Sequence, residues 1–172
     1  MFDKRKEGRN ARKGIPPKVR QMFSDEICQK IQNFITENDV VMLYNDIDGE
    51  VDVSKIAENS NNKFLFPRVE GDNIVPVFGK NFYKGSYGIQ EPLGDVYFGK
   101  INTVIVPMCA FDEKCNRLGF GKGFYDRFLS ERECLKIGVA FSCQKTDFIE
   151  TKPTDVKMDY IVTEKYILEC SE

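Results

Sequence analysis

The sequence contains no histidine and no long apolar run among its 172 residues. Without histidine, the chain lacks the commonest general base and the commonest ligand for transition metals. No segment approaches the length of about 18 apolar residues that a membrane-spanning helix needs. The first 20 residues are basic but lack the apolar stretch of a secretory signal. We therefore expect a cytoplasmic protein that does not engage a membrane.

The sequence also lacks paired cysteines, because none of its six cysteines forms a C-x-x-C motif. Several lie in apolar segments, which is typical of reduced, partly buried thiols in a reducing compartment rather than of a disulfide framework. A structural zinc site would need cysteine ligands alone, and the spacing does not favour one. The prediction of reduced thiols covers Cys28, Cys109, Cys115, Cys134, Cys143 and Cys170.

The chain carries little excess charge, with a formal net charge of -2. Basic residues concentrate near the start, where composition alone favours a solvated or frayed arm over residues 1–17 rather than a phosphate-binding segment. Gly8 and Gly14 weaken this segment as a helix. A nucleotide- or RNA-binding module built on this arm is a competing hypothesis. The small net charge and the absence of a basic, aromatic-rich sheet pattern argue against nucleic acid as a partner.

The apolar pattern predicts one α/β domain over residues 1–172. Apolar residues recur every three or four positions over 18–35, as on one face of a helix. The continuously apolar run 103–108 is typical of a strand buried on both faces of a parallel sheet. We expect an open α/β sandwich, in which helices flank a mainly parallel central sheet. Further helices are predicted over 53–59 and 123–130, strands over 40–44, 63–69, 74–78, 103–108, 136–141 and 160–163, and a loop suited to a lid or to binding over 79–100.

Residues 117–127, RLGFGKGFYDR, carry the strongest indication of chemistry. Three alternating glycines let backbone N–H groups approach an anion closely, and a helix that starts directly after them would add its positive end. Arg117, Lys122 and Arg127 supply positive charge for phosphate oxygens. Asp126 supplies an oxygen ligand of the kind that magnesium prefers.

This glycine pattern is neither a Walker A motif nor the dinucleotide-binding fingerprint, because its spacing fits neither and Lys122 is followed by glycine. A bare G-x-G-x-G also fits a tight turn between a strand and a helix. The three basic residues and the carboxylate around the glycines favour phosphate binding over that structural alternative.

Six segments of the chain together resemble the 5-formyltetrahydrofolate cyclo-ligase family. Residues 117–129, RLGFGKGFYDRFL, are similar to the family's RLGxGxGYYDxxL signature. Each segment alone is a modest indication, but all six follow the family's order over most of the chain. The other five are GEVD at 49–52, FPRV at 66–69, GIQEP at 88–92, PMCAFD at 107–112 and TDVKMD at 154–159.

The resemblance implies an enzyme that couples ATP cleavage to the closure of 5-formyltetrahydrofolate into 5,10-methenyltetrahydrofolate, with Mg2+ as cofactor and ATP as co-substrate. Phosphoryl transfer to the formyl oxygen would give an iminium phosphate, which the neighbouring anilino nitrogen would attack with release of phosphate. Such a reaction depends on positioning and charge neutralisation more than on a strong base, so the lack of histidine is no obstacle. Small molecules are the expected partners of what we expect to be a monomer.

The resemblance also implies roles for individual residues. ATP would contact Lys4, Arg5, Arg117, Gly119, Phe120, Gly121, Lys122, Gly123 and Asp126, with Lys122 and Arg127 as the catalytic side chains that face phosphate. The folate would contact Tyr44, Glu50, Phe124 and Tyr125, and magnesium would bind Asp126 and Asp155. Without the resemblance, the simpler interpretations are a strand end for Glu50, core packing for the adjacent aromatic pair, and an ordinary turn for Asp155.

Two departures from the family's pattern bear on these roles. The family opens with K-x-x-x-R, whose side chains reach ATP, and this places the lysine at Met1 if Arg5 takes the arginine position. Lys4 or Lys6 would then substitute. Thr154 stands where the family often has histidine. Two alternatives stay open: a relative that binds folate or nucleotide without turnover, and an ATP-dependent ligase with another substrate.

Overall fold

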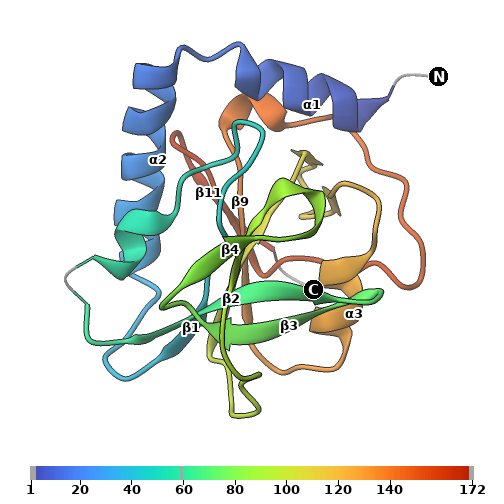
Figure 1. The fold of residues 1–172 in the computed structure, drawn as a ribbon. Coiled ribbons are helices and arrows are strands. Elements are labelled where there is room, and N and C mark those ends of the chain that lie inside the picture. The colour runs from blue at the N-terminus through green and yellow to red at the C-terminus, as the bar shows by residue number, and fades with distance from the viewer. Residues whose placement is uncertain (1–2, 59, 171–172) are drawn as a thin grey trace.

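The structure is a computed structural model that describes residues 3–58 and 60–170 (Figure 1). Its central sheet contains β1 (Val40–Met42), β2 (Lys63–Glu70), β3 (Asn73–Phe78), β6 (Thr103–Pro107), β9 (Leu135–Val139), β10 (Tyr160–Val162) and β11 (Ile167–Glu169). The strand order is β11-β10-β9-β6-β1-β2-β3. Neighbours are parallel except β2–β3 and β10–β11, the antiparallel pairs at the two edges. The prediction of an α/β fold with a mainly parallel central sheet is confirmed.

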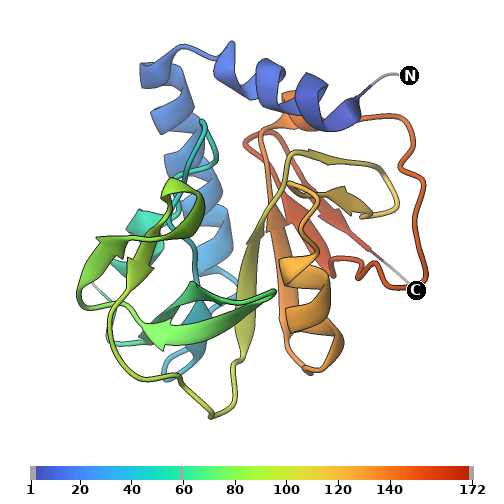
Figure 2. The same cartoon turned by 45° about the vertical axis from the view of Figure 1, so that its right-hand side comes forward.

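Both faces of the sheet are covered by apolar side chains. In β6, Val104 and Val106 belong to one core cluster and Ile105 belongs to the other, and all three are fully buried. The helix α3 (Phe124–Ser130) packs in the first cluster and α2 (Pro17–Gln32) in the second, on opposite sides of the sheet (Figure 2). This two-sided burial accounts for the continuous apolarity of β6. No helix within the described ranges is long and apolar enough to cross a bilayer.

The basic N-terminal segment forms a helix, α1 (Lys4–Lys13), which lies across the carboxyl ends of the parallel strands (Figure 2). The expectation of a frayed arm is therefore wrong, for two local reasons. The carboxylate of Asp3 accepts hydrogen bonds from two N–H groups of the first turn and so caps the helix. Gly8 permits close packing, because a Cβ there would collide with the carbonyl oxygen of Cys109. The second of these contacts is tertiary and leaves no trace in the local sequence.

Several predicted boundaries also differ from the structure. The helix expected over 18–35 ends at Gln32. The helix expected over 53–59 is a short 3-10 turn, Ser54–Ala57, and residue 59 lies outside the described residues. The segment 79–100 contains an antiparallel hairpin of β4 (Phe82–Lys84) and β5 (Gln90–Pro92) instead of loop alone. Every residue of β4 is exposed, so this strand lacks the apolar alternation that predicts strands. The smaller elements missed by the pattern also include β7 (Ala110–Phe111), β8 (Arg117–Leu118), and the 3-10 turns Ser86–Gly88 and Ser142–Gln144.

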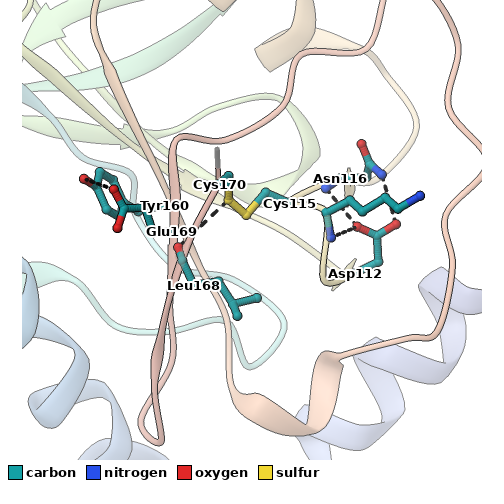
Figure 3. Close-up of a disulfide and its surroundings, with 8 residues drawn as sticks. Asp112, Cys115, Asn116, Tyr160, Leu168, Glu169 and Cys170 are labelled. Atoms are coloured by element: carbon teal, nitrogen blue, oxygen red, sulfur yellow. Dashed lines mark hydrogen bonds between the residues drawn. A yellow bond between two sulfur atoms is a disulfide. The ribbon is translucent and has the colours of Figure 1, made fainter. Parts of the chain in front are cut away.

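A disulfide joins Cys115, in the loop between β7 and β8, to Cys170 at the end of β11 (Figure 3). The prediction of reduced thiols is wrong for this pair. The two cysteines are 55 residues apart in sequence, and their Cα atoms are 5.9 Å apart, within the usual range for a disulfide. They meet because both bond to the segment before β10: Met158 N–H donates to the Cys115 carbonyl, and Cys170 N–H donates to the Asp159 carbonyl. The thiols of Cys28, Cys109, Cys134 and Cys143 are free.

Candidate functional site

The strand order changes direction at β1, and this locates a binding site. The neighbours of β1 are β2 on one side and β6 on the other. In open α/β sheets, ligands bind outside the carboxyl ends of the strands at such a point. A cavity of about 1420 Å³ lies there. Tyr44, which follows β1, and Met108, which follows β6, both line it.

The cavity brings together segments that are distant in the sequence. Its walls come from α1, the turn after β1, the glycine-rich segment and the loop before β10. Every predicted site residue lines it except one: the lining includes Arg5, Tyr44, Glu50, Arg117, all of residues 119–127, and Asp155. Lys4 is the residue that does not. Its Nζ donates to the carbonyl of Phe148 and lies 5.6 Å from the centre of that ring.

Arg5 joins helix α1 to the glycine-rich loop. Its Nε–H donates to the carbonyl oxygen of Gly119 at 2.8 Å. The loop that follows β8 turns through Gly121 at a φ of 95° and Gly123 at a φ of 70°, both in the left-handed region. At Gly123 a Cβ would also come within 2.7 Å of an Arg127 nitrogen. These two positions favour glycine for conformational reasons, and the result is an open loop along the cavity wall.

Arg117 and Asp126 form a mostly buried ion pair in the wall of the cavity. Arg117 Nη2 donates to Asp126 Oδ1 at 2.8 Å, and the same oxygen accepts from Val156 N–H at 3.0 Å. The Arg117 side chain is only 6% exposed. Burial lowers its pKa, and the charge of Asp126 opposes that effect. Its Nε–H is buried and has no hydrogen-bond partner among the described residues.

Arg127 and Lys122 differ in how firmly the protein holds them. Arg127 Nη2 donates to the carbonyls of Lys122 and Asp72, so this side chain braces the loop backbone. Lys122 is exposed, and its Nζ lies 5.5 Å from the centre of the Tyr87 ring. Lys122 is therefore the less firmly held of the two predicted phosphate-facing cations.

The predicted metal ligands both line the cavity but do not form a cage. Among the described residues there is no group of three or more His, Cys, Asp or Glu side chains placed to hold a metal. Asp126 is bonded to Arg117, and Asp155 Oδ2 accepts from Lys152 N–H at 2.8 Å. Magnesium in phosphoryl-transfer sites usually binds one or two carboxylates together with substrate phosphates and water. Two carboxylates beside a phosphate-binding loop fit that mode of binding.

The turn after β1 carries a buried carboxylate and a buried phenol. Glu50 is 6% exposed, and its Oε2 accepts from Ile47 N–H at 3.0 Å. Burial raises the Glu50 pKa to about 7, although that hydrogen bond and the charge of Arg12 act in the opposite direction. Tyr44 donates its hydroxyl to the Val51 carbonyl at 2.7 Å, and burial raises its pKa. Burial and the charge of Glu50 also raise the pKa of Tyr125. The turn thus places the buried carboxylate of Glu50 in the lining, together with Asp48, which is paired with cations of α1.

Some lining residues were not predicted. Arg9 lies one turn after Arg5 on the same helix, and it was missed because the segment was interpreted as an arm. Tyr87 and Glu91 come from the segment interpreted as a loop. Glu91 is buried, and its carboxylate accepts from Val69 N–H at 3.2 Å and from the Tyr83 hydroxyl at 3.0 Å. The GIQEP segment was the available sequence indication for Glu91.

Comparisons with known proteins agree with this geometry. Residues 3–164 match the family described as the 5-formyltetrahydrofolate cyclo-ligase family. A 5-formyltetrahydrofolate cyclo-ligase from Escherichia coli is 24% identical over 179 residues, which cover 94% of this chain and 98% of that protein. The enzyme of the same name from Mycoplasma pneumoniae is 43% identical over 68 residues, which span 41% of that protein.

The fold is similar to that of a solved relative. The 5,10-methenyltetrahydrofolate synthetase of Aquifex aeolicus aligns with a TM-score of 0.83 and 30% sequence identity. The alignment covers 98% of this chain and 92% of that one. The similarity therefore extends over the strands, α1 and the loops that form the cavity.

Proposed function

Because the chain belongs to the 5-formyltetrahydrofolate cyclo-ligase family, we propose that it converts 5-formyltetrahydrofolate to 5,10-methenyltetrahydrofolate with cleavage of ATP to ADP and phosphate. The observation that carries the proposal is that one cavity holds both kinds of surface that the reaction needs. The glycine-rich loop lines the cavity together with Arg5, Arg117 and Lys122. The turn after β1 presents Glu50 together with Tyr44, which belongs to the second core cluster.

The chemistry follows from the poor leaving ability of a formamide oxygen. The γ-phosphoryl group of ATP is transferred to that oxygen, which gives an iminium phosphate and ADP. The neighbouring anilino nitrogen then attacks the activated carbon and loses its proton, and phosphate departs with the oxygen. The protein's task is to hold the oxygen in line with the γ-phosphorus and to offset the phosphate charge. Arg5, Arg117 and Lys122 supply that charge.

Individual residues take the following roles in this proposal. Asp126 and Asp155 would hold magnesium, which neutralises phosphate charge when bound. Arg127 keeps the loop in shape through the carbonyl of Lys122. Glu50 accepts hydrogen bonds from the donor edge of the pterin, with Phe124 and Tyr125 beside the ring system. Lys4 lies outside the cavity lining, so we assign the phosphate contacts of α1 to Arg5. We further propose a monomer that works in the cytoplasm.

A spectrophotometric assay tests the proposal. Purified protein is mixed with 5-formyltetrahydrofolate and magnesium, with or without ATP, and the near-ultraviolet absorbance of methenyltetrahydrofolate is followed. The expected result is a rise that requires ATP and is lost when magnesium is chelated. A flat trace from folded protein would contradict turnover. Binding of each substrate, measured separately, would then distinguish a non-catalytic relative from a ligase for another substrate.

A further inference from the structure

The helix α1 carries two arginines, Arg5 and Arg9, whose guanidinium groups are held in the same way. In each, the Nε–H is committed to an acceptor from another segment: Arg5 to the Gly119 carbonyl at 2.8 Å, and Arg9 to Asp48 Oδ2 at 2.6 Å. Their Nη groups make no hydrogen bond with any residue in the described ranges. Both residues line the cavity. Each guanidinium is thus anchored at one nitrogen and leaves its two terminal nitrogens available.

Arg12, on the same helix, has a guanidinium group in which all three nitrogens donate hydrogen bonds to the protein. Its Nε donates to the Asp48 carbonyl at 2.8 Å, its Nη1 to the Met108 carbonyl at 3.2 Å, and its Nη2 to the Asp48 carboxylate at 3.2 Å. Its side chain is fully buried, and it does not line the cavity. Arg12 therefore holds the helix in place. Arg9, one turn earlier, keeps two terminal nitrogens without a hydrogen-bond partner among the described residues.

The local charge leaves room for an anion. Three cations, Arg9, Arg12 and Lys13, contact the single carboxylate of Asp48. Direct contacts thus place three positive charges on one carboxylate, and the more distant Glu50 and Asp3 offset part of that excess. Of the three cations, Arg9 alone lines the cavity. Its guanidinium carbon lies 5.2 Å from the centre of the Phe120 ring, so the side chain is stacked against the glycine-rich loop.

We propose that Arg9 is a further phosphate-binding residue of the site, which Asp48 positions so that its two terminal nitrogens face the polyphosphate of the nucleotide. This inference rests on the proposed function. A guanidinium that is fixed at Nε presents a planar pair of donors that matches two phosphate oxygens. Because Arg5 and Arg9 are four residues apart, they lie on one face of the helix and present two such pairs along the same wall. A carboxylate of the folate's glutamate tail has similar chemistry, and the test separates the two anions.

The test measures the dissociation constants of ATP, ADP, AMP and 5-formyltetrahydrofolate by titration calorimetry, each without the other substrate. For Arg9→Gln, we expect ATP to bind about tenfold more weakly, ADP less affected, AMP nearly unaffected, and the folate changed less than about twofold. The matched control is Lys13→Gln, which removes the same charge from the same carboxylate at a position outside the cavity. It should change ATP binding by less than about twofold. Asp48→Asn should weaken ATP binding by about threefold, because Arg9 loses its charged anchor.

Several outcomes would overturn the inference. They are an unchanged ATP affinity in Arg9→Gln, an equal loss in Lys13→Gln, and weaker folate binding with nucleotide binding intact. If Arg9→Gln does not fold, Arg9→Lys decides. The single ammonium nitrogen of lysine cannot both bond to Asp48 and present a planar pair of donors. That variant should bind ATP about threefold more weakly, and wild-type affinity would count against the assignment. A wild-type protein that binds no ATP would remove the proposed function itself, which is a distinguishable result.

Discussion

On the glycine-rich side of the cavity, charged groups remain accessible, whereas on the side built by the turn after β1 they are buried. Phe120 is 47% exposed and Lys122 is exposed, while Glu50 is 6% exposed and Tyr44 is 4% exposed. Cations on the first side can meet a polyphosphate that arrives with its own charge. The carboxylate on the second side has a pKa raised to about 7, so it changes charge near neutrality. One cavity therefore contains one surface suited to an anion and another suited to a mostly neutral heterocycle.

Arg117 is the exception to this division, and its replacement should give the largest effect. It is a buried cation on the exposed side, and it holds Asp126. Arg117→Gln should lower kcat/KM by about 100-fold, or roughly 2.7 kcal/mol, because a phosphate contact is lost and Asp126 loses its partner. Steady-state kinetics at saturating folate would measure this.

Arg117→Lys is the matched control, since it keeps the charge and removes the planar fork. It should recover part of the lost activity. Circular dichroism melts of both variants would separate a folding defect from a catalytic one. Equal activity in Arg117→Gln and wild type would remove Arg117 from the site.

The helix α1 spans both sides of the cavity, and Gly8 decides whether it can lie there. A Cβ at this position would collide with the Cys109 carbonyl. Gly8→Ala should therefore lower the free energy of unfolding by about 2 kcal/mol, despite the better helix propensity of alanine. Urea denaturation would measure it. Gly14→Ala, at the end of the same helix with a φ of -71°, should be close to neutral, and an equal loss in both variants would contradict the packing argument.

The glycine-rich loop and helix α1 show where the sequence is informative and where it is not. The glycine-rich loop was predicted because its residues are contiguous, so that spacing and residue type alone identify an anion site. The helix α1 was missed because Gly8 is needed for close packing against the backbone of Cys109, about 100 residues away. Such a contact leaves no local pattern in the sequence. Cys115 and Cys170 were missed as a disulfide for the same reason.

The sheet was predictable because its pattern is an average over many residues. The run 103–108 indicated two-sided burial, and the structure has β6 at the centre of the sheet. The short hairpin of β4, whose residues are all exposed, and β5 has no such pattern, so Tyr87 and Glu91 could not be placed at the cavity from periodicity. The resemblance named the family and most of the predicted lining residues, whereas the position of Lys4 outside the cavity lining is visible only in the structure.

A change of pH separates the two sides of the cavity further, because the buried Glu50 side chain destabilises the folded state when it is charged. Its folded-state pKa of about 7 lies above the ordinary value of 4.5. The folded state favours the protonated side chain. This contribution to stability is therefore fully present below about pH 4.5 and is lost as pH rises through 7. Between pH 5.5 and 8, the free energy of unfolding of the wild type should fall by about 2 kcal/mol relative to Glu50→Gln. Urea titrations of both proteins at the two pH values would measure this difference.

The same variant separates the two sides by function. Glu50→Gln should raise the KM for 5-formyltetrahydrofolate by about tenfold at pH 8, because an amide replaces one acceptor with a donor. The dissociation constant of ATP should stay within about twofold of wild type. A parallel loss of ATP binding would place Glu50 in the general structure of the cavity rather than on its folate side.

Lys122 should give an effect no larger than that of Glu50, since it is an exposed charge on the nucleotide side. Lys122→Ala should lower kcat/KM for ATP by about tenfold, or roughly 1.4 kcal/mol, because its mobile ammonium group neutralises phosphate charge without a fixed geometry. Arg127→Ala is a less selective test, because Arg127 also braces the carbonyl of Lys122 and its loss would loosen the loop. Lys114→Ala is the control: Lys114 is also exposed, but it lies outside the cavity, and its removal should leave the rate unchanged. If both lysine variants behave alike, the accessible charge of the glycine-rich side acts through the general field of the protein and not through contact with phosphate.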